Sequence, residues 1–546
     1  MDRTGEQGDG SVSLPSARHA LDAGGDGVES VWRGKHRLFA RVGTFIAVGA
    51  LATMFVTAAN AEAPTQPATR AELEEQVMAL QEQVRAMQEE QKGLTETLKR
   101  VQQQLASQPA PAAAQLVPPT SAAAAPAPLV VASAPADGQG ADGSITQSVL
   151  ERYQDGIVIW QTPDDAKVPF LLKYNINSQV RYLNTTSGEE TFTDHLGAVR
   201  GVNLRNDITV NRTMFILGGY IFDPRLRYSS TVWTSAGSNS IVIAGNIGWQ
   251  FNKAFTLTGG YTGVPGSRSL VATFPFFQST DRTMADNFFR PGFTQGIWAN
   301  GEVTRGLHYL AFVGNGLNTL NISAAKIDEN LMAAGSVWWE PLGEYGPPGK
   351  SRNMYDDYYA SPDLRIRLGT SFTWAREDRF SDLDQSSPEN TSMHNSDGVL
   401  TFATGAFAPG VTVDNATYRM WAIDWGLKKY GWSVNGQYFF RWVDDFEADG
   451  PIPIDNMFDH GFELSAAAFI LPQQLMAYGR GSMVFGEFRD SWEAGVGVKW
   501  SFVPTERMWL TAEVMRVVDV PYGGVFTPYT AGLTAWVPMV QAVLAF

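Results

Sequence analysis

The chain has 546 residues, no cysteine and a formal net charge of −15. The lack of cysteine excludes disulfides, cysteine-based zinc sites and thiol catalysis, and the acidic balance argues against nucleic acid as a partner because phosphate binding needs clustered Lys and Arg. Aromatic residues reach 12% and charged residues only 18%, with 53 glycines. This composition is typical of many short β-strands joined by turns.

The N-terminal region predicts an export signal. A basic segment from Arg33 to Arg41 precedes mostly apolar residues 42–56, and the sequence Ala-Asn-Ala follows at 59–61. This order is that of a cleavable secretory signal, whereas a membrane-spanning helix would need about 20 apolar residues. We assign residues 31–61 to the signal, with cleavage expected after its last residue, and interpret residues 1–30 as a mis-annotated extension.

Residues 69–108 predict a coiled-coil helix. Apolar residues recur at alternating spacings of four and three, with charged residues and Gln between them. Such a narrow stripe is buried by self-association, so we expect an oligomer; a lone amphipathic helix is the alternative. Gln91 lies on the seam, where one polar residue can fix the register. The seam comprises Leu73, Val77, Leu80, Val84, Met87, Gln91, Leu94, Leu98, Val101 and Leu105.

The next segment, residues 109–146, is rich in Ala and Pro. Such a sequence cannot form a packed core and is typical of a semi-rigid spacer, here with a reach on the order of 100 Å. It separates the predicted helix from a C-terminal region, residues 150–546.

Residues 150–546 alternate between apolar and polar side chains. In WSVNGQYFFRW (432–442), aromatic and aliphatic residues occupy one face of a strand, while Ser433, Asn435 and Arg441 occupy the other. Segments of this kind are long enough for a tilted strand to cross a bilayer, and several begin or end with an aromatic residue. A soluble β-sandwich or propeller is the alternative, with shorter strands and buried aromatic stripes.

Short and long connections alternate along this region, as in outer-membrane barrels. The brief turns are 222–225, 251–253, 304–306, 428–431, 471–474 and 503–507. The longer polar loops are 184–205, 263–292, 314–330, 380–415, 445–459 and 519–530. Segment 340–363 is an unusually long member of the turn set. Counting hairpins predicts an all-β transmembrane antiparallel barrel of about 16 strands.

The last strand must pair with the first, because lipid tolerates no open sheet edge. Val540, Ala542, Leu544 and Phe546 share one face of it, which we assign to lipid. A terminal Phe preceded by alternate apolar residues resembles the signal that the outer-membrane barrel assembly machinery reads. We therefore expect a bacterial outer-membrane protein with its N-terminal helix in the periplasm.

Three stretches resemble the phosphate-selective porin O and P family: NRTMFILGGYIFDPRLRYSSTVWTS, LTGGYTGVPGSRSLVATFPFF and MWAIDWGLKKYGWSVNGQYFFRW. The resemblance covers about 150–546, and the preceding coiled coil is similar to a subset of that family. It implies a homotrimer of sixteen-stranded barrels and a passive pore for small anionic or polar solutes. It also implies that the third extracellular loop, here 263–292, folds inward as a constriction.

The implied constriction loop carries Arg268, Arg282, Arg290, Asp281 and Asp286. Arginine suits the oxygens of phosphate and carboxylates. By alternation, other basic side chains are expected to face the lumen: Arg225, Arg227, Arg365, Arg367, Arg441, Arg480 and Lys499. Several acids share that face, so pairing across a weakly selective lumen is the alternative.

The fifth loop argues against strict phosphate specificity, since residues 381–415 contain no Lys or Arg and several acids. The sequence predicts a porin with a modest preference for anions, either phosphate or small carboxylates. The alternative is a general porin that also tethers the outer membrane to the cell wall through its coiled coil. The four histidines of the region are scattered, and no catalytic motif accompanies them. We therefore expect no enzymatic activity, metal or cofactor.

Overall fold

The structure is a computed structural model that describes residues 155–546 except 236–239, 272–274, 321, 347–354, 381–387, 504 and 525–526. The predicted extension, signal, coiled coil and linker lie outside the described residues. No helix within the described part of the chain has the length and apolar character needed to cross a bilayer.

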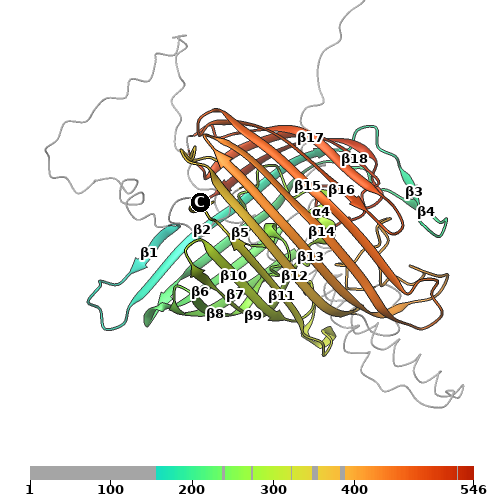
Figure 1. The fold of residues 1–546 in the computed structure, drawn as a ribbon, viewed down its shortest axis with the longest axis horizontal. Helices are drawn as coiled ribbons and strands as arrows, with labels where there is room; N and C mark the ends of the chain where they lie inside the picture. Colours follow the sequence, from blue (N-terminus) through green and yellow to red (C-terminus); the bar gives the residue numbers. More distant parts are fainter. Residues whose placement is uncertain are drawn as a thin grey trace, which may run out of the picture. The chain divides into compact units, whose positions relative to one another are not determined.

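Sixteen antiparallel strands close into a barrel (Figure 1), which confirms the predicted fold. Each strand pairs with its neighbours along the chain, and β19 pairs with β2 to close the ring. The strands are β2 (Phe170–Asn184), β5 (Asn206–Ile221), β6 (Asp223–Ser235), β7 (Ser240–Asn252), β8 (Phe255–Gly263), β9 (Phe293–Thr304), β10 (Leu307–Gly314), β11 (Met332–Trp339), β12 (Arg365–Asp378), β13 (Val413–Lys429), β14 (Trp432–Ala448), β15 (Asn456–Leu471), β16 (Leu475–Phe485), β17 (Ser491–Trp500), β18 (Met508–Val518) and β19 (Ala535–Ala545).

The seam between β19 and β2 runs to the last residue of the chain. Ile176 N donates to Phe546 O at 2.7 Å, and Phe546 N donates to Ile176 O at 2.8 Å. A short strand that the sequence did not predict, β1 (Ile157–Gln161), pairs with β2 directly beyond this point. The outer face of β19 carries Val540, Ala542, Leu544 and Phe546, while the residues between them are buried. Their role as an assembly signal stays a prediction.

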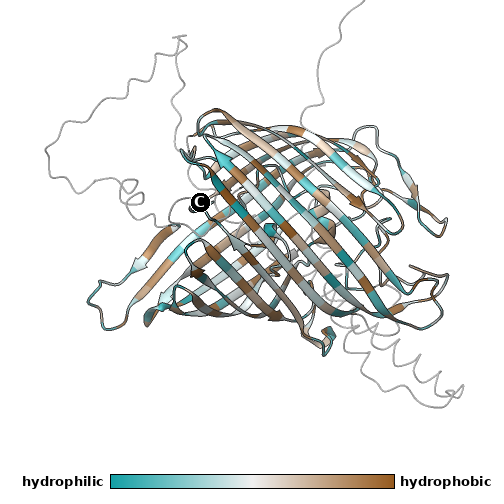
Figure 2. Cartoon of the chain, in the orientation of Figure 1, coloured by the Kyte–Doolittle hydropathy of each residue, from teal (hydrophilic) through white to brown (hydrophobic). Residues whose placement is uncertain are grey.

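The outer wall of the barrel is apolar. In β13, Trp421, Ile423 and Trp425 are 37–41% exposed, while the intervening Ala422 and Asp424 are buried. Figure 2 shows hydrophobic and hydrophilic residues alternating along the strands. A closed ladder of backbone hydrogen bonds with an apolar outside is the architecture of a transmembrane β-barrel.

The connections at the two rims differ. At the rim near the C-terminus, Phe222, Tyr430 and Gln473 adopt positive φ values of 65°, 50° and 60° in very tight turns, because left-handed backbone matches the twist of paired strands. The opposite rim carries the longer loops, and one of them contains the exposed hairpin of β3 (Thr191–Thr193) and β4 (Val199–Gly201).

The alternation of loop lengths is less regular than predicted. The predicted loop 445–459 is shorter, because β14 continues to Ala448 and β15 begins at Asn456. The connections β6–β7 and β16–β17 at the same rim are also short.

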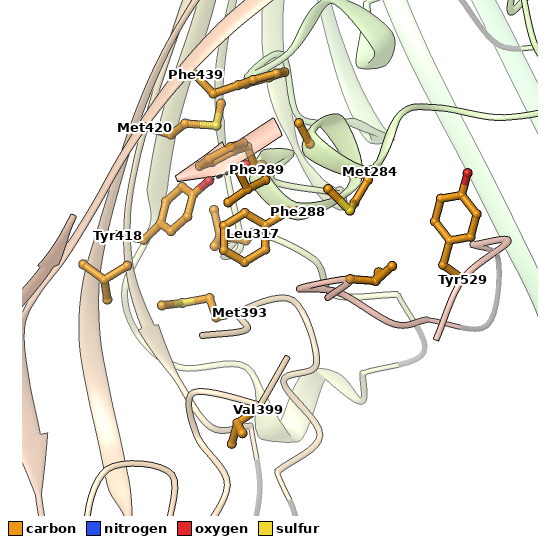
Figure 3. Close-up of a cluster of buried hydrophobic side chains, with 14 of the residues drawn as sticks. Met284, Phe288, Phe289, Leu317, Met393, Val399, Tyr418, Met420, Phe439 and Tyr529 are labelled. Carbon is orange, nitrogen blue, oxygen red and sulfur yellow. Dashed lines mark hydrogen bonds between the residues drawn. The ribbon is translucent and has the colours of Figure 1, made fainter. Parts of the chain in front are cut away.

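Part of the interior is apolar. Within the loop that follows β8, helix α4 (Met284–Phe289) is buried and packs against β15, β16 and β17. Figure 3 shows Phe288 and Phe289 beside Tyr418 and Phe439 of the barrel wall, and the rings of Phe289 and Phe439 stack at 5.1 Å. The barrel is therefore partly filled, rather than lined throughout with polar side chains. Two 3-10 turns, η1 (Arg268–Leu270) and η2 (Ala324–Lys326), complete the described helices.

The outward position of Ile423 yields a test. An arginine there would place a charge in lipid, so we expect Ile423→Arg to lower the free energy of unfolding by about 2–4 kcal/mol, measured by urea unfolding in phospholipid vesicles. Tyr430→Arg is the matched control, since Tyr430 is 65% exposed in a rim turn, where a charge costs about 0–1 kcal/mol. Equal losses in both variants would contradict a lipid-facing wall.

Candidate functional site: the pore interior

The connection between β8 and β9, residues 264–292, crosses the barrel interior. Near its middle, Gln541 of β19 donates to Thr280 O at 2.8 Å. Farther along, Met284 N donates to Glu493 of β17 at 2.8 Å. Nearly every described residue of this inward loop is buried. It therefore reaches from the β8–β9 wall to the far side of the lumen.

Asp281 holds the inward loop to the wall through arginines. Arg181 Nη2 lies 2.7 Å from Asp281 Oδ2, and Arg212 Nη1 lies 3.4 Å from the same oxygen. Burial alone would raise the pKa of Asp281, but Arg212, Arg181 and Arg282 outweigh it and hold that pKa well below its usual range. One carboxylate is thus surrounded by three guanidinium groups, which leaves the cluster with a positive balance.

A β-bulge positions Arg212. The pairing of β5 with β2 skips Asn211, so both Asn211 and Arg212 are buried, whereas Val210 and Phe215 on either side of them are exposed. One extra residue in a strand reverses the in–out alternation. Without the bulge, Arg212 would share the outer face with Val210.

A cavity of about 530 Å³ lies between the inward loop, the inner faces of β5–β8 and the long-loop rim. Arg212, Arg282 and Arg290 line it, and no Asp or Glu is among the described residues that do so. Aromatic side chains, including Trp233 and Tyr261, form part of its wall. This chamber, which we call the arginine vestibule, thus has three bases and no acid in its described lining, while the acids that pair with Arg212 and Arg282, Asp281 and Asp286, lie outside that lining.

His394 also lines the arginine vestibule and adds no charge there. Burial, helped by Arg441, lowers the pKa of its imidazole to about 3. Its ring packs edge-on against Tyr522 with centroids 4.6 Å apart.

Most of the basic wall residues predicted to face the lumen lie in the interior, but they are paired with acids. Arg367 bonds Asp424 at 2.8 Å, and Arg441 bonds Asp459 at 2.6 Å. The remaining pairs are Arg480 with Glu493 (3.5 Å) and Glu513 (3.1 Å), and Lys499 with Asp356 (2.9 Å). These pairs cancel much of the fixed charge that the sequence suggested for anion binding.

Four other predicted basic residues are not part of these interior ion pairs. Arg268 of the inward loop does not line the arginine vestibule; its guanidinium lies over the rings of Tyr345 and Tyr355 at 5.2 and 4.2 Å. Arg365 donates to Leu342 O at 2.5 Å. Arg225 and Arg227 are exposed at the start of β6 and, in register, share the lumen face with Trp233.

Asp286 and Arg290 are placed differently from each other. Asp286 is buried in α4, with its carboxylate 3.5 Å from Arg282 Nε. Arg290 caps the C-terminal end of α4 and reaches the arginine vestibule.

A second cavity of about 750 Å³ opens near the rim with the tight turns. Its lining mixes both charge signs, with Glu302, Glu340 and Asp357 beside Lys253 and Lys428. The two ends of the interior thus differ in charge: among the described lining residues, the arginine vestibule has bases and no acid, whereas the second cavity has both.

No family model and no curated relative matches the chain. Among solved structures, the chain is similar to OmpT of Vibrio cholerae (10% identity, 71% of this chain and 100% of that one, TM-score 0.43). It is also similar to the outer membrane channel DcaP of Acinetobacter baumannii (8%, 71% and 100%, 0.41) and to the anion-selective porin from Comamonas acidovorans (11%, 69% and 100%, 0.39). At these values the fold assignment rests on the strand pairing.

The Asp281 cluster predicts an acid-sensitive loop. A carboxylate whose pKa is lower in the folded than in the unfolded protein gives its full stabilisation above the unfolded pKa, about 3.9, and loses it as the pH falls further. We expect Asp281→Asn to lower stability at pH 7 by about 3–5 kcal/mol, because Arg181 and Arg212 lose their buried carboxylate partner, and to flatten the loss of stability below about pH 4.

Thermal unfolding in detergent from pH 7 to pH 2 measures both effects. Asp223→Asn is the control, since Asp223 pairs with Arg225 on the exposed rim. An Asp281→Asn profile that runs parallel to wild type would contradict the role of this carboxylate.

Proposed function

We propose that the protein is an outer-membrane channel for passive diffusion of small hydrophilic solutes, with a modest preference for anions such as phosphate or small carboxylates. The arginine vestibule carries the proposal, because Arg212, Arg282 and Arg290 line it without an acid among its described lining residues. Charge of one sign in a narrow, low-dielectric passage concentrates ions of the other sign. Membership of the phosphate-selective porin O and P family is part of the same proposal.

The preference is expected to be modest because the remaining interior charges are balanced. Arg367, Arg441 and Lys499 each have an acidic partner within 3 Å. The lining of the second cavity mixes both charge signs and adds no strong selection. This balance favours a weakly selective general porin as the second candidate, with the cell-wall tether as its additional role.

We also propose a homotrimer. A hollow of about 700 Å³ on the outer wall spans β15–β19 and is lined mainly by small side chains, including Ala466, Gly479 and Val496. Small residues allow another barrel to approach closely, whereas the wall elsewhere carries large residues such as Ile243 and Trp421. The hollow supports a contact between copies at this side of the barrel.

Filling the hollow tests the trimer. We expect Val496→Trp to weaken association, since the larger ring would occupy the space that a second barrel needs, and cross-linking in native membranes would then give fewer trimers. Ile243→Trp is the control, because Ile243 is 77% exposed on β7, outside the hollow. Monomers alone in the wild type would contradict the proposal.

Anion preference is tested by the reversal potential of single channels in a KCl gradient. We expect an anion-selective sign in the wild type and a shift toward zero in the double variant Arg212→Gln/Arg290→Gln, because two of the three positive charges of the arginine vestibule are removed.

Arg225→Gln serves as the matched control, since Arg225 is exposed at the rim and paired with Asp223. A cation-selective wild type would contradict the anion preference and leave the channel itself intact. Equal potentials in the wild type and the double variant would assign selection to another part of the pore.

A further inference from the structure

The connection between β11 and β12 folds into the barrel although it belongs to the rim with the tight turns. Tyr345 is 2% exposed and Tyr355 is 9% exposed, whereas Tyr430 in a neighbouring tight turn is 65% exposed. The described parts of this connection, 340–346 and 355–364, therefore do not form an ordinary surface turn. We refer to them as the inward turn.

The wall has side chains placed to hold the inward turn. Tyr345 Oη donates to Asn435 Oδ1 at 2.7 Å, and Asn435 Nδ2 donates to Tyr355 O at 3.0 Å. Lys428 Nζ donates to Tyr345 O at 3.0 Å. A side chain at Gly426 would place its Cβ only 2.4 Å from the Tyr345 hydroxyl. The glycine in the strand thus leaves the space that the tyrosine ring occupies.

The inward turn meets the inward loop inside the lumen. Arg268 of the loop lies over the rings of Tyr345 and Tyr355 at 5.2 and 4.2 Å, which are cation–π distances. Beside them, Lys499 donates both to Phe277 O of the loop at 3.2 Å and to Asp356 of the turn at 2.9 Å. Two segments from opposite rims are thus joined by two buried cations.

The open space of the interior lies beside other strands than those that the inward turn and the inward loop contact together. The arginine vestibule is lined by Thr231, Ala244 and Tyr261 on the inner faces of β6, β7 and β8. Farther along β6, Arg227 remains exposed on the lumen face. By contrast, the joined segments contact β13, β14 and β17 through Lys428, Asn435 and Lys499.

We propose that the inward turn is a second constricting element of the pore. In this proposal Tyr345 and Tyr355, held in place by their contact with Arg268, limit the conductance of the pore. Together with the inward loop, the turn closes the side of the lumen toward β13–β17 and confines solutes to the passage along β5–β8. This inference rests on the proposed channel function. It goes beyond it by assigning the limit on conductance to the inward turn, which belongs to the rim opposite that of the inward loop.

The test is the single-channel conductance of Tyr345→Ala/Tyr355→Ala in planar bilayers. Loss of both rings and of their contact with Arg268 should open the closed side, so conductance should rise by at least about twofold over wild type. Tyr430→Ala removes the same side chain from the rim outside the lumen and should leave conductance unchanged. Heat-dependent mobility of each variant in SDS gels verifies that the barrel is folded.

A second measurement keeps the inference testable if the double variant folds poorly. Because the chain contains no cysteine, a single Tyr355→Cys substitution gives one reactive thiol. A cationic methanethiosulfonate reagent added to one side of the bilayer should reduce the current stepwise, since Tyr355 is placed inside the lumen. The same reagent on Tyr430→Cys should have little effect.

The outcomes separate the two proposals. A conducting wild type whose current is unchanged by the double alanine variant and by modification of Tyr355→Cys overturns the second constriction and leaves the channel function standing. Folded protein that gives no channel in any variant overturns the channel function, and this inference with it. A rise in conductance confined to the Tyr345→Ala/Tyr355→Ala variant supports the inward turn as the limit.

Discussion

The structure depends on one constraint: in lipid, each backbone N–H and C=O of a spanning strand must find its partner within the protein. The pairing of β19 with β2 meets this constraint at the only place where the sheet would otherwise have two open edges. Phe546 takes part in this pairing, since its N–H and C=O both bond Ile176. An apolar outer face follows from the same condition, because the outer surface of the barrel contacts lipid instead of water.

Inside the barrel the governing cost is that of buried charge. A guanidinium without a partner in a low-dielectric interior is strongly destabilising, so Arg367, Arg441 and Arg480 are matched to acids across neighbouring strands. Net charge survives where the inward loop brings in more cations than carboxylates, around Asp281 and along the arginine vestibule. Selectivity in such a barrel therefore depends on how its loops fold inward more than on how many basic residues its strands carry.

The sequence predicted the barrel well because alternation and strand length are local signals. It could not predict the side of the wall that Arg212 faces, since the bulge at Asn211 reverses the alternation without a signal in the residue types. The buried positions of Tyr345 and Tyr355 were also missed, because an inward turn is stabilised by distant partners such as Asn435 and Arg268. The same holds for Phe439, an apolar residue on the inner face that packs on Phe289 from a loop 150 positions earlier. The positions of these residues depend on contacts with residues far away in the sequence. A period-two pattern carries no information about such contacts.

The short strand β1 has a consequence for chain connectivity. It lies on β2 in line with β19, so that Ile157 opposite Tyr174 follows closely on Phe546 opposite Ile176. The first strand of the described chain, β1, and its last residue, Phe546, therefore pair with adjacent positions of β2. A linker of a few residues would join them, and a circular permutant with new termini in the short connection 449–455 would preserve every rung of the ladder.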